Sequence, residues 1–291
     1  MVVKSLNVKG FPYPIVVHGS CYGMRSRRNK EVGHRLEDSN LKQQEYWNKL
    51  WTTQNWASRD SLGEMIDYVK FRHLLNILPM KGSSIEIGCG SARVSSWLAL
   101  KGYETFAMDY SKQALITAKN SYFQLSLSGD FVCADAFKLP FKNETFNIVL
   151  STGLLEHFSD PFPIVREMTR ILKVRGLFYA DIVPKKFSTF RLLRRLGEKV
   201  LNVGLNSDEM FENRLNQKQI EKLLTANGLS NVHVYGMGVI VPSLKSIQLL
   251  RSPNLGKETL KKRCYWNYVK WLDKTKLGSL LGWYFFCYGW K

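Results

Sequence analysis

The chain has 291 residues, of which 45% are hydrophobic and 13% aromatic, and its formal net charge is +18. This length and composition indicate one substantial globular domain and exclude a disordered chain. The closest approach to a membrane span is the apolar stretch over residues 277–290, which is shorter than the roughly 18–20 residues that a spanning helix needs.

The N-terminal part of the chain changes character near residue 41. Residues 1–40 are polar, aperiodic and basic, and we expect a poorly ordered extension there. From Leu41 to Leu78 the apolar residues recur at helical spacing, which predicts two helices, the second over Leu62–Leu78. Pro79 and Gly82 end this helical part.

Short apolar runs then alternate with helical patterns. Strands are predicted over residues 84–88, 104–108, 130–134, 146–151 and 176–183, and helices over 92–101, 112–120 and 161–172. Ser111 is the expected N-cap of the helix that follows it. The alternation indicates βαβ units, hence a mainly parallel sheet with helices on both faces.

The pattern changes again beyond residue 184. An amphipathic basic helix is predicted over Phe187–Leu205, and a second helix over Asn216–Ala226 is closed by Gly228. Strands over residues 232–241 and 283–288 flank a helical insertion, and the last strand should return antiparallel at the edge of the sheet.

The predicted fold class is therefore α/β, with a Rossmann-like sheet of seven mostly parallel strands and the last strand antiparallel. One domain would cover residues 41–291, with its cofactor-binding core over about 80–183. Helical cap insertions would lie at about 184–212 and 242–278.

Charge and cysteines limit the cellular setting. Residues 184–291 hold 19 Lys/Arg against 7 Asp/Glu, which suits anionic partners such as phosphorylated lipids or nucleic acid but also fits a solvated face. The five cysteines are odd in number and form no CxxC pair, which predicts reduced thiols in a cytoplasmic protein and no metal site. Pro12 and Pro14 interrupt an N-terminus that does not resemble a signal peptide.

Chemistry concentrates after the predicted strands. Gly88 and Gly90 stand between a strand and a helix, where glycine lets a cofactor approach the backbone. Arg93 replaces the third glycine of a dinucleotide fingerprint, which counts against NAD. Glu86 lies inside the apolar strand, so its carboxylate needs a partner, either loop amides or a cofactor ammonium.

Later strand ends carry further candidates. Asp109 follows the second strand, where an acid accepts from ribose hydroxyls, and Tyr110 can lie along an adenine. Asp135, followed by Ala136, could accept from the adenine amino group. Ser151 ends the fourth strand at the same edge of the sheet.

Four segments in this order resemble class I S-adenosylmethionine methyltransferases, in the broad group that includes ubiquinone and menaquinone methyltransferases. They are Glu86-Ile-Gly-Cys-Gly90, Met108-Asp-Tyr-Ser111, Asp135-Ala136 with Leu139-Pro-Phe141, and Leu154-Leu-Glu-His157. The resemblance implies S-adenosyl-L-methionine as cofactor, bound by Glu86, Gly88, Cys89, Gly90, Asp109, Tyr110, Asp135, Ala136 and Ser151. Gly153 stands where some members carry a metal-binding Glu, so metal dependence is not expected.

His157 is the candidate catalytic residue, because a neutral imidazole can take a proton from a hydroxyl or amine acceptor. Glu156-His157 is equally compatible with a structural role. We expect a small or amphiphilic acceptor, such as a quinone or lipid-linked intermediate. RNA methylation through the basic C-terminal third and a non-catalytic cofactor-binding regulator are the alternatives. The segments 46–56, 187–205 and 242–276 would select the acceptor, and Phe187–Leu205 could also touch an anionic membrane.

Overall fold

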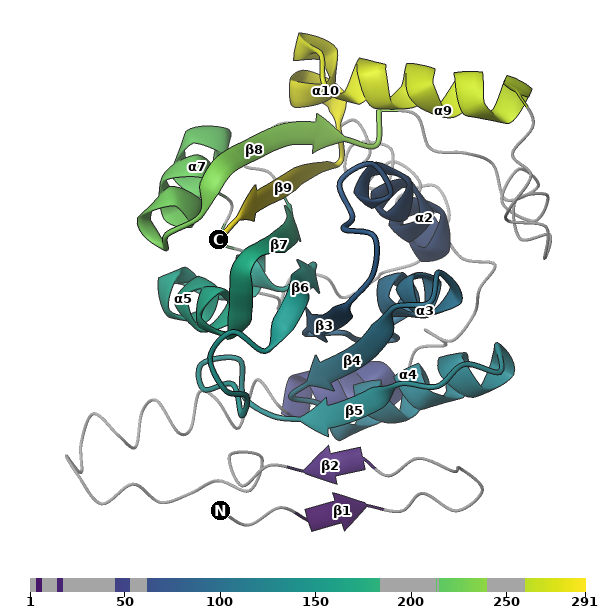
Figure 1. The fold of residues 1–291 in the computed structure, drawn as a ribbon, viewed down its shortest axis with the longest axis vertical. Coiled ribbons are helices and arrows are strands. Elements are labelled where there is room, and N and C mark those ends of the chain that lie inside the picture. The colour runs from purple at the N-terminus through teal and green to yellow at the C-terminus, as the bar shows by residue number, and fades with distance from the viewer. Residues whose placement is uncertain are drawn as a thin grey trace, which may run out of the picture. The chain divides into compact units, whose positions relative to one another are not determined.

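The computed structural model describes residues 4–6, 15–17, 45–52, 62–183, 213, 215–239 and 260–291. Its strands are β1 Lys4–Leu6, β2 Ile15–Val17, β3 Ser83–Ile87, β4 Glu104–Asp109, β5 Asp130–Cys133, β6 Phe146–Thr152, β7 Leu172–Ile182, β8 Ser230–Met237 and β9 Tyr284–Trp290 (Figure 1). Its helices are α2 Leu62–Leu74, α3 Arg93–Leu100, α4 Lys112–Gln124, α5 Phe162–Ile171, α7 Gln217–Ala226, α9 Leu260–Asp273 and α10 Lys276–Leu281, with a 3-10 turn η2 at Leu155–His157. A further helix covers residues 45–52.

The chain divides into two compact units. The first comprises Met1–Arg59, Met80–Thr152 and Arg166–Gly176, and the second comprises Asp60–Pro79, Gly153–Val165 and Leu177–Lys291. Each unit contains paired strands and buried hydrophobic residues.

The first unit holds the parallel part of the sheet. Its strands follow the order β1-β2-β5-β4-β3-β6, and all neighbours are parallel except the β1–β2 pair. Helix α3 packs on β3 and β4, and helix α4 packs on β4 and β5. Because these four strands are parallel, the carboxyl ends of β3, β4, β5 and β6 lie at the same edge of the sheet.

In the second unit, β9 lies between β7 and β8 and is antiparallel to both. Helices α7, α9 and α10 pack on β8. Counted along the chain, β3 to β9 are the seven predicted strands, and the last is antiparallel, so the predicted fold class is confirmed. The strands β1 and β2 fall within the range predicted as a poorly ordered extension.

Helix boundaries follow the expected capping chemistry. The Ser111 hydroxyl accepts from the Ala114 N–H at 3.2 Å and caps α4, as predicted. Asn216 and Gln219 form a reciprocal capping box at the start of α7. Strand β7 begins at Leu172, four residues before the predicted start. Its first residues after Leu172 are the half-buried Lys173 and the exposed Val174 and Arg175, in which the one apolar side chain stands between two basic ones. The predicted helix Phe187–Leu205 lies outside the described residues.

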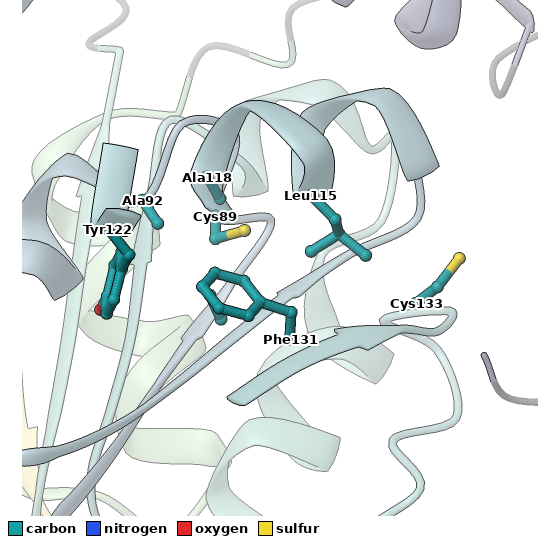
Figure 2. Close-up of a cluster of buried hydrophobic side chains, with 8 residues drawn as sticks. Cys89, Ala92, Leu115, Ala118, Tyr122, Phe131 and Cys133 are labelled. Atoms are coloured by element: carbon teal, nitrogen blue, oxygen red, sulfur yellow. The ribbon is translucent and has the colours of Figure 1, made fainter. Parts of the chain in front are cut away.

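A hydrophobic cluster fills the first unit behind the turn after β3. It joins that turn to α4 and β5 and consists of Cys89, Ala92, Ala107, Leu115, Ala118, Tyr122, Phe131 and Cys133 (Figure 2). The Tyr122 and Phe131 rings meet edge to face with centroids 5.3 Å apart, and the Tyr122 hydroxyl lies 3.0 Å from the Thr105 Oγ1. The turn therefore rests on a packed base.

The core of the second unit combines aromatic rings with buried ionisable groups. Lys70 lies 3.0 Å from the Asp181 carboxylate and 3.1 Å from the Asp67 carboxylate. His73 bridges Asp273, 2.8 Å from its Nε2, and the Tyr235 hydroxyl, 3.0 Å from its Nδ1. These contacts tie α2 to β7, β8 and α9.

Candidate functional site

The turn after β3 lies between a strand and a helix, as the sequence predicted. Gly88 and Gly90 have φ of 67° and 51°, and Ala92, at the start of α3, also has φ of 51°. The Cys89 N–H donates to the Met108 carbonyl at 2.9 Å, so the turn continues the pairing of β3 with β4. Glycine suits the two positive φ values because a side chain is strained there.

Asp109, at the end of β4, ties this turn to the next one. One carboxylate oxygen accepts from the Gly90 N–H at 2.9 Å and the other from the Ser111 N–H at 2.8 Å. Burial raises the pKa of Asp109 to about 6, although the two amide bonds act in the opposite direction. A carboxylate offers about four acceptor positions, so Asp109 retains capacity for hydroxyl donors from a ligand.

Glu86 finds its partners within the protein. One oxygen accepts from the Ser95 N–H at 3.1 Å and from the Ser95 hydroxyl at 2.6 Å, and the other accepts from the Thr152 hydroxyl at 2.8 Å. The sequence required a partner for this buried acid but did not indicate Ser95 or Thr152. Glu86 thus fixes β3 against the first turn of α3 and the end of β6.

The Cys89 side chain points into the hydrophobic cluster (Figure 2) and is 5% exposed. Burial raises the pKa of its thiol well above the ordinary value. The thiol is therefore a small apolar packing group rather than a nucleophile, and only the Cys89 backbone belongs to the turn.

The loops after β4 and β5 are linked. The Ala134 N–H donates to the Asp109 carbonyl at 3.2 Å, and the Cys133 thiol lies 3.6 Å from the Tyr110 carbonyl. One Asp135 oxygen accepts from the Phe137 N–H at 3.0 Å, and burial raises the pKa of Asp135. The half-buried Tyr110 packs against the hydrophobic cluster.

Ala136 and Ser151 are both buried in the first unit. The Ser151 hydroxyl has no hydrogen-bond partner among the described residues. Because buried hydroxyls are nearly always satisfied, this group is a candidate for hydrogen bonding to a ligand or water. Together with Glu86, Gly88, Cys89, Gly90, Asp109, Tyr110 and Asp135, these two complete the predicted cofactor residues, and all nine lie in the first unit.

A contact that the sequence did not predict comes from the helix over residues 45–52. The Trp51 ring lies against Gly90, where an added Cβ would come within 2.6 Å of it. The Ser111 hydroxyl bonds to the Asn48 side chain at 2.6 Å. That residues 46–56 help to select the acceptor stays a prediction, and these contacts show that the helix lies against the turns after β3 and β4.

His157 ends the η2 turn in the second unit, where its N–H donates to the Leu154 carbonyl at 3.1 Å. Its side chain is half-buried. The Glu156 carbonyl accepts from the Asn213 N–H. A catalytic role for His157 stays a prediction.

The part of the chain that carries this site is similar to known methyltransferases. Residues 85–180 match the family model described as methyltransferase domain. A ubiquinone biosynthesis O-methyltransferase of Coxiella burnetii (strain RSA 331 / Henzerling II) is 21% identical over 206 residues, which cover 69% of this chain and 88% of the relative.

Two solved structures share the fold. One is an S-adenosylmethionine-dependent methyltransferase of Thermotoga maritima, with a TM-score of 0.50, 19% identity, and coverage of 78% of this chain and 90% of that one. The other is phosphoethanolamine N-methyltransferase 2 of Haemonchus contortus in complex with S-adenosyl-L-methionine, with a TM-score of 0.51, 16% identity, and coverage of 84% and 56%.

Proposed function

We propose that this chain, which is a class I S-adenosylmethionine-dependent methyltransferase, transfers the cofactor's methyl group to a small or amphiphilic acceptor such as a quinone or a lipid-linked intermediate. The name of the Coxiella burnetii relative, which aligns with 69% of the chain, supports an acceptor of this class. The carboxylate of Asp109, held between the Gly90 and Ser111 amides, is the observation that carries the cofactor half of the proposal.

The turns after β3 and β4 fit the cofactor. Gly88 and Gly90 would let its amino acid portion approach the main chain. The remaining lone pairs of Asp109 would accept from the ribose hydroxyls, and Tyr110 would border the adenine. When bound, the cofactor supplies an electrophilic methyl group on a sulfonium sulfur.

The loop after β5 and the end of β6 would complete the site. Asp135 uses one oxygen for the Phe137 amide, which leaves the other to accept from the adenine amino group beside Ala136. Ser151 would donate or accept through its hydroxyl, which has no hydrogen-bond partner within the described part of the chain. Glu86 acts as a positioning residue, because both of its oxygens already hold Ser95 and Thr152.

The chain's own contribution to the reaction is alignment and exclusion of water. Methyl transfer needs the acceptor atom, the methyl carbon and the sulfur in one line, and correct placement supplies most of the rate enhancement. We assign His157 the task of taking the proton from a hydroxyl acceptor, which a neutral imidazole does near neutral pH.

Two further assignments belong to this proposal. Phe187–Leu205, which lies outside the described residues, would cap the site or touch an anionic membrane. RNA as the acceptor rests on the net charge of +18 alone. In the part of the chain that the structure describes, no helix is long and apolar enough to cross a bilayer.

The experiment is a methyl-transfer assay with cofactor labelled on the methyl group. Hydroxyquinones and catechols with short and long prenyl tails are compared with total RNA, using the wild type and His157→Gln. The proposal expects labelled quinone product, with a kcat for His157→Gln lowered by about 10²-fold or more and unchanged affinity for the cofactor. If only RNA is labelled, the acceptor is RNA and the proposed acceptor class is wrong. If the cofactor binds but no acceptor is labelled, the result favours a non-catalytic cofactor-binding regulator.

A further inference from the structure

The outer surface of α9 and α10 exposes large apolar side chains. We define the α9–α10 surface by its five exposed apolar members, which are Tyr265 (40% exposed), Tyr268 (53%), Trp271 (62%), Leu277 (42%) and Leu280 (63%). Single exposed apolar residues are ordinary, but several gathered on one short segment mark an interaction site.

The helical geometry shows that this exposure is not incidental to packing. Trp266 and Val269 form the buried face of α9, at 1% and 0% exposure. Tyr268 and Trp271 each follow one of these by two residues, which is about 200° around the helix axis. The two outer rings stack on each other with centroids 5.9 Å apart, so the helix is apolar on both faces.

The segment that carries these rings is predominantly basic. Residues 260–291 contain seven Lys/Arg and one acid, Asp273. Asp273 is fully buried and bonds to His73 at 2.8 Å, so its carboxylate is not exposed at this surface. Lys274 and Lys276, by contrast, are exposed on the short stretch that follows Trp271, with the Lys274 Nζ 5.5 Å from the centroid of the Tyr235 ring. The surface is therefore complementary to an anionic partner.

We propose that the α9–α10 surface binds the headgroup region of an anionic phospholipid bilayer. Tyrosine and tryptophan rings favour the membrane interface, where the apolar body and the polar edge are both satisfied. Leu277 and Leu280 enter the upper acyl region, whereas a nucleic acid would offer aliphatic side chains no stacking partner.

The dimensions agree with a helix lying on the surface. Helix α9 has 14 residues, about 21 Å of helix, which is short of the roughly 30 Å hydrocarbon core. The inference goes beyond the proposed methyl transfer, since it uses neither the cofactor residues nor an acceptor.

The test is flotation of the full chain with large vesicles of phosphatidylcholine, with and without phosphatidylglycerol. Tyr268→Ser/Trp271→Ser should lower binding to the anionic vesicles at least about tenfold, because both rings leave the interface. Lys274→Gln/Lys276→Gln should lower it about fivefold for each lysine and flatten its dependence on salt.

Matched controls lie in the first unit. Phe123→Ser removes an aromatic ring that is 60% exposed on α4, and Lys101→Gln/Lys142→Gln removes two exposed lysines. All variants should keep the wild-type circular dichroism spectrum, and the controls should bind vesicles as the wild type does.

A fluorophore on Cys264 gives a second readout. Cys264 is exposed and precedes Trp271 by two turns on the same side of α9. In a Cys21→Ser background, its emission should shift to the blue with anionic vesicles. The proposal is overturned if the wild type does not float, if the ring variant floats as well as the wild type, or if RNA rather than lipid retains the chain.

Discussion

Gly90→Ala tests the contact between the helix over residues 45–52 and the turn after β3. The glycine has φ of 51°, and a residue with a Cβ pays about 1–2 kcal/mol in that region. The added methyl group would also lie 2.6 and 2.7 Å from two ring atoms of Trp51. Displacing the ring adds about 1–3 kcal/mol, so the total loss of unfolding free energy is about 2–5 kcal/mol.

A double-mutant cycle separates the backbone strain from the steric clash with Trp51. In a Trp51→Ala background the clash disappears, so Gly90→Ala should lower the unfolding free energy only by the backbone strain. The coupling energy between the two substitutions should therefore be about 1–3 kcal/mol. The measurement is guanidinium denaturation followed by circular dichroism.

Gly102→Ala is the control, because Gly102 has φ of 84° and nothing within 4 Å of an added Cβ. It should cost the backbone part alone and show no coupling to Trp51→Ala. Additivity of Gly90→Ala and Trp51→Ala within about 0.5 kcal/mol would refute the docking of this helix on the turn.

Three further predictions concern buried ionisable groups. Because the pKa of Asp109 is about 6, the affinity for the demethylated cofactor product should fall as pH drops through that value. Calorimetry from pH 5 to 8 measures this affinity, and a constant affinity would contradict a role of the Asp109 carboxylate in binding. Burial lowers the pKa of His73, so the unfolded chain binds more protons than the folded one. The unfolding free energy should therefore fall as pH drops below 6.5. Denaturation measurements on His73→Gln should show that this pH dependence is lost. Lys70→Met leaves the Asp181 carboxylate buried without its cation and should cost about 3–5 kcal/mol, whereas Lys70→Met/Asp181→Leu should recover most of it; equal losses in the single and double variants would contradict the pairing.

Local signals were sufficient for the sheet and for the turns after β3 and β4. A strand, two glycines and a helix in that order predicted the turn in which Gly88 and Gly90 have positive φ. Asp109 was predictable because acids at the end of the second strand of such folds face the ligand edge. Ser111 was predictable as a cap from its place before a helix.

The contacts that sequence reasoning missed join residues far apart in the chain. Trp51 contacts Gly90, and Asn48 forms a hydrogen bond with Ser111. No periodic pattern in the sequence predicts either contact. Burial of Glu86 was predictable from its apolar neighbours, but the choice of Thr152 depends on the register of β3 with β6. The early start of β7 was missed because Val174, the one apolar residue among 173–175, stands between two basic residues and is exposed.

Calorimetric titration of S-adenosylmethionine and its demethylated product into the wild type, Asp109→Ala and Asp130→Ala tests the central claim most directly. Asp130 is an exposed acid in the same unit and serves as the matched control. The account predicts micromolar binding to the wild type and to Asp130→Ala, and a loss of about 10²-fold or more in Asp109→Ala, since hydrogen bonds to a charged group contribute about 1.5–3 kcal/mol each. A folded wild type that binds neither compound, or an Asp109→Ala variant that binds as tightly as the wild type, would contradict it.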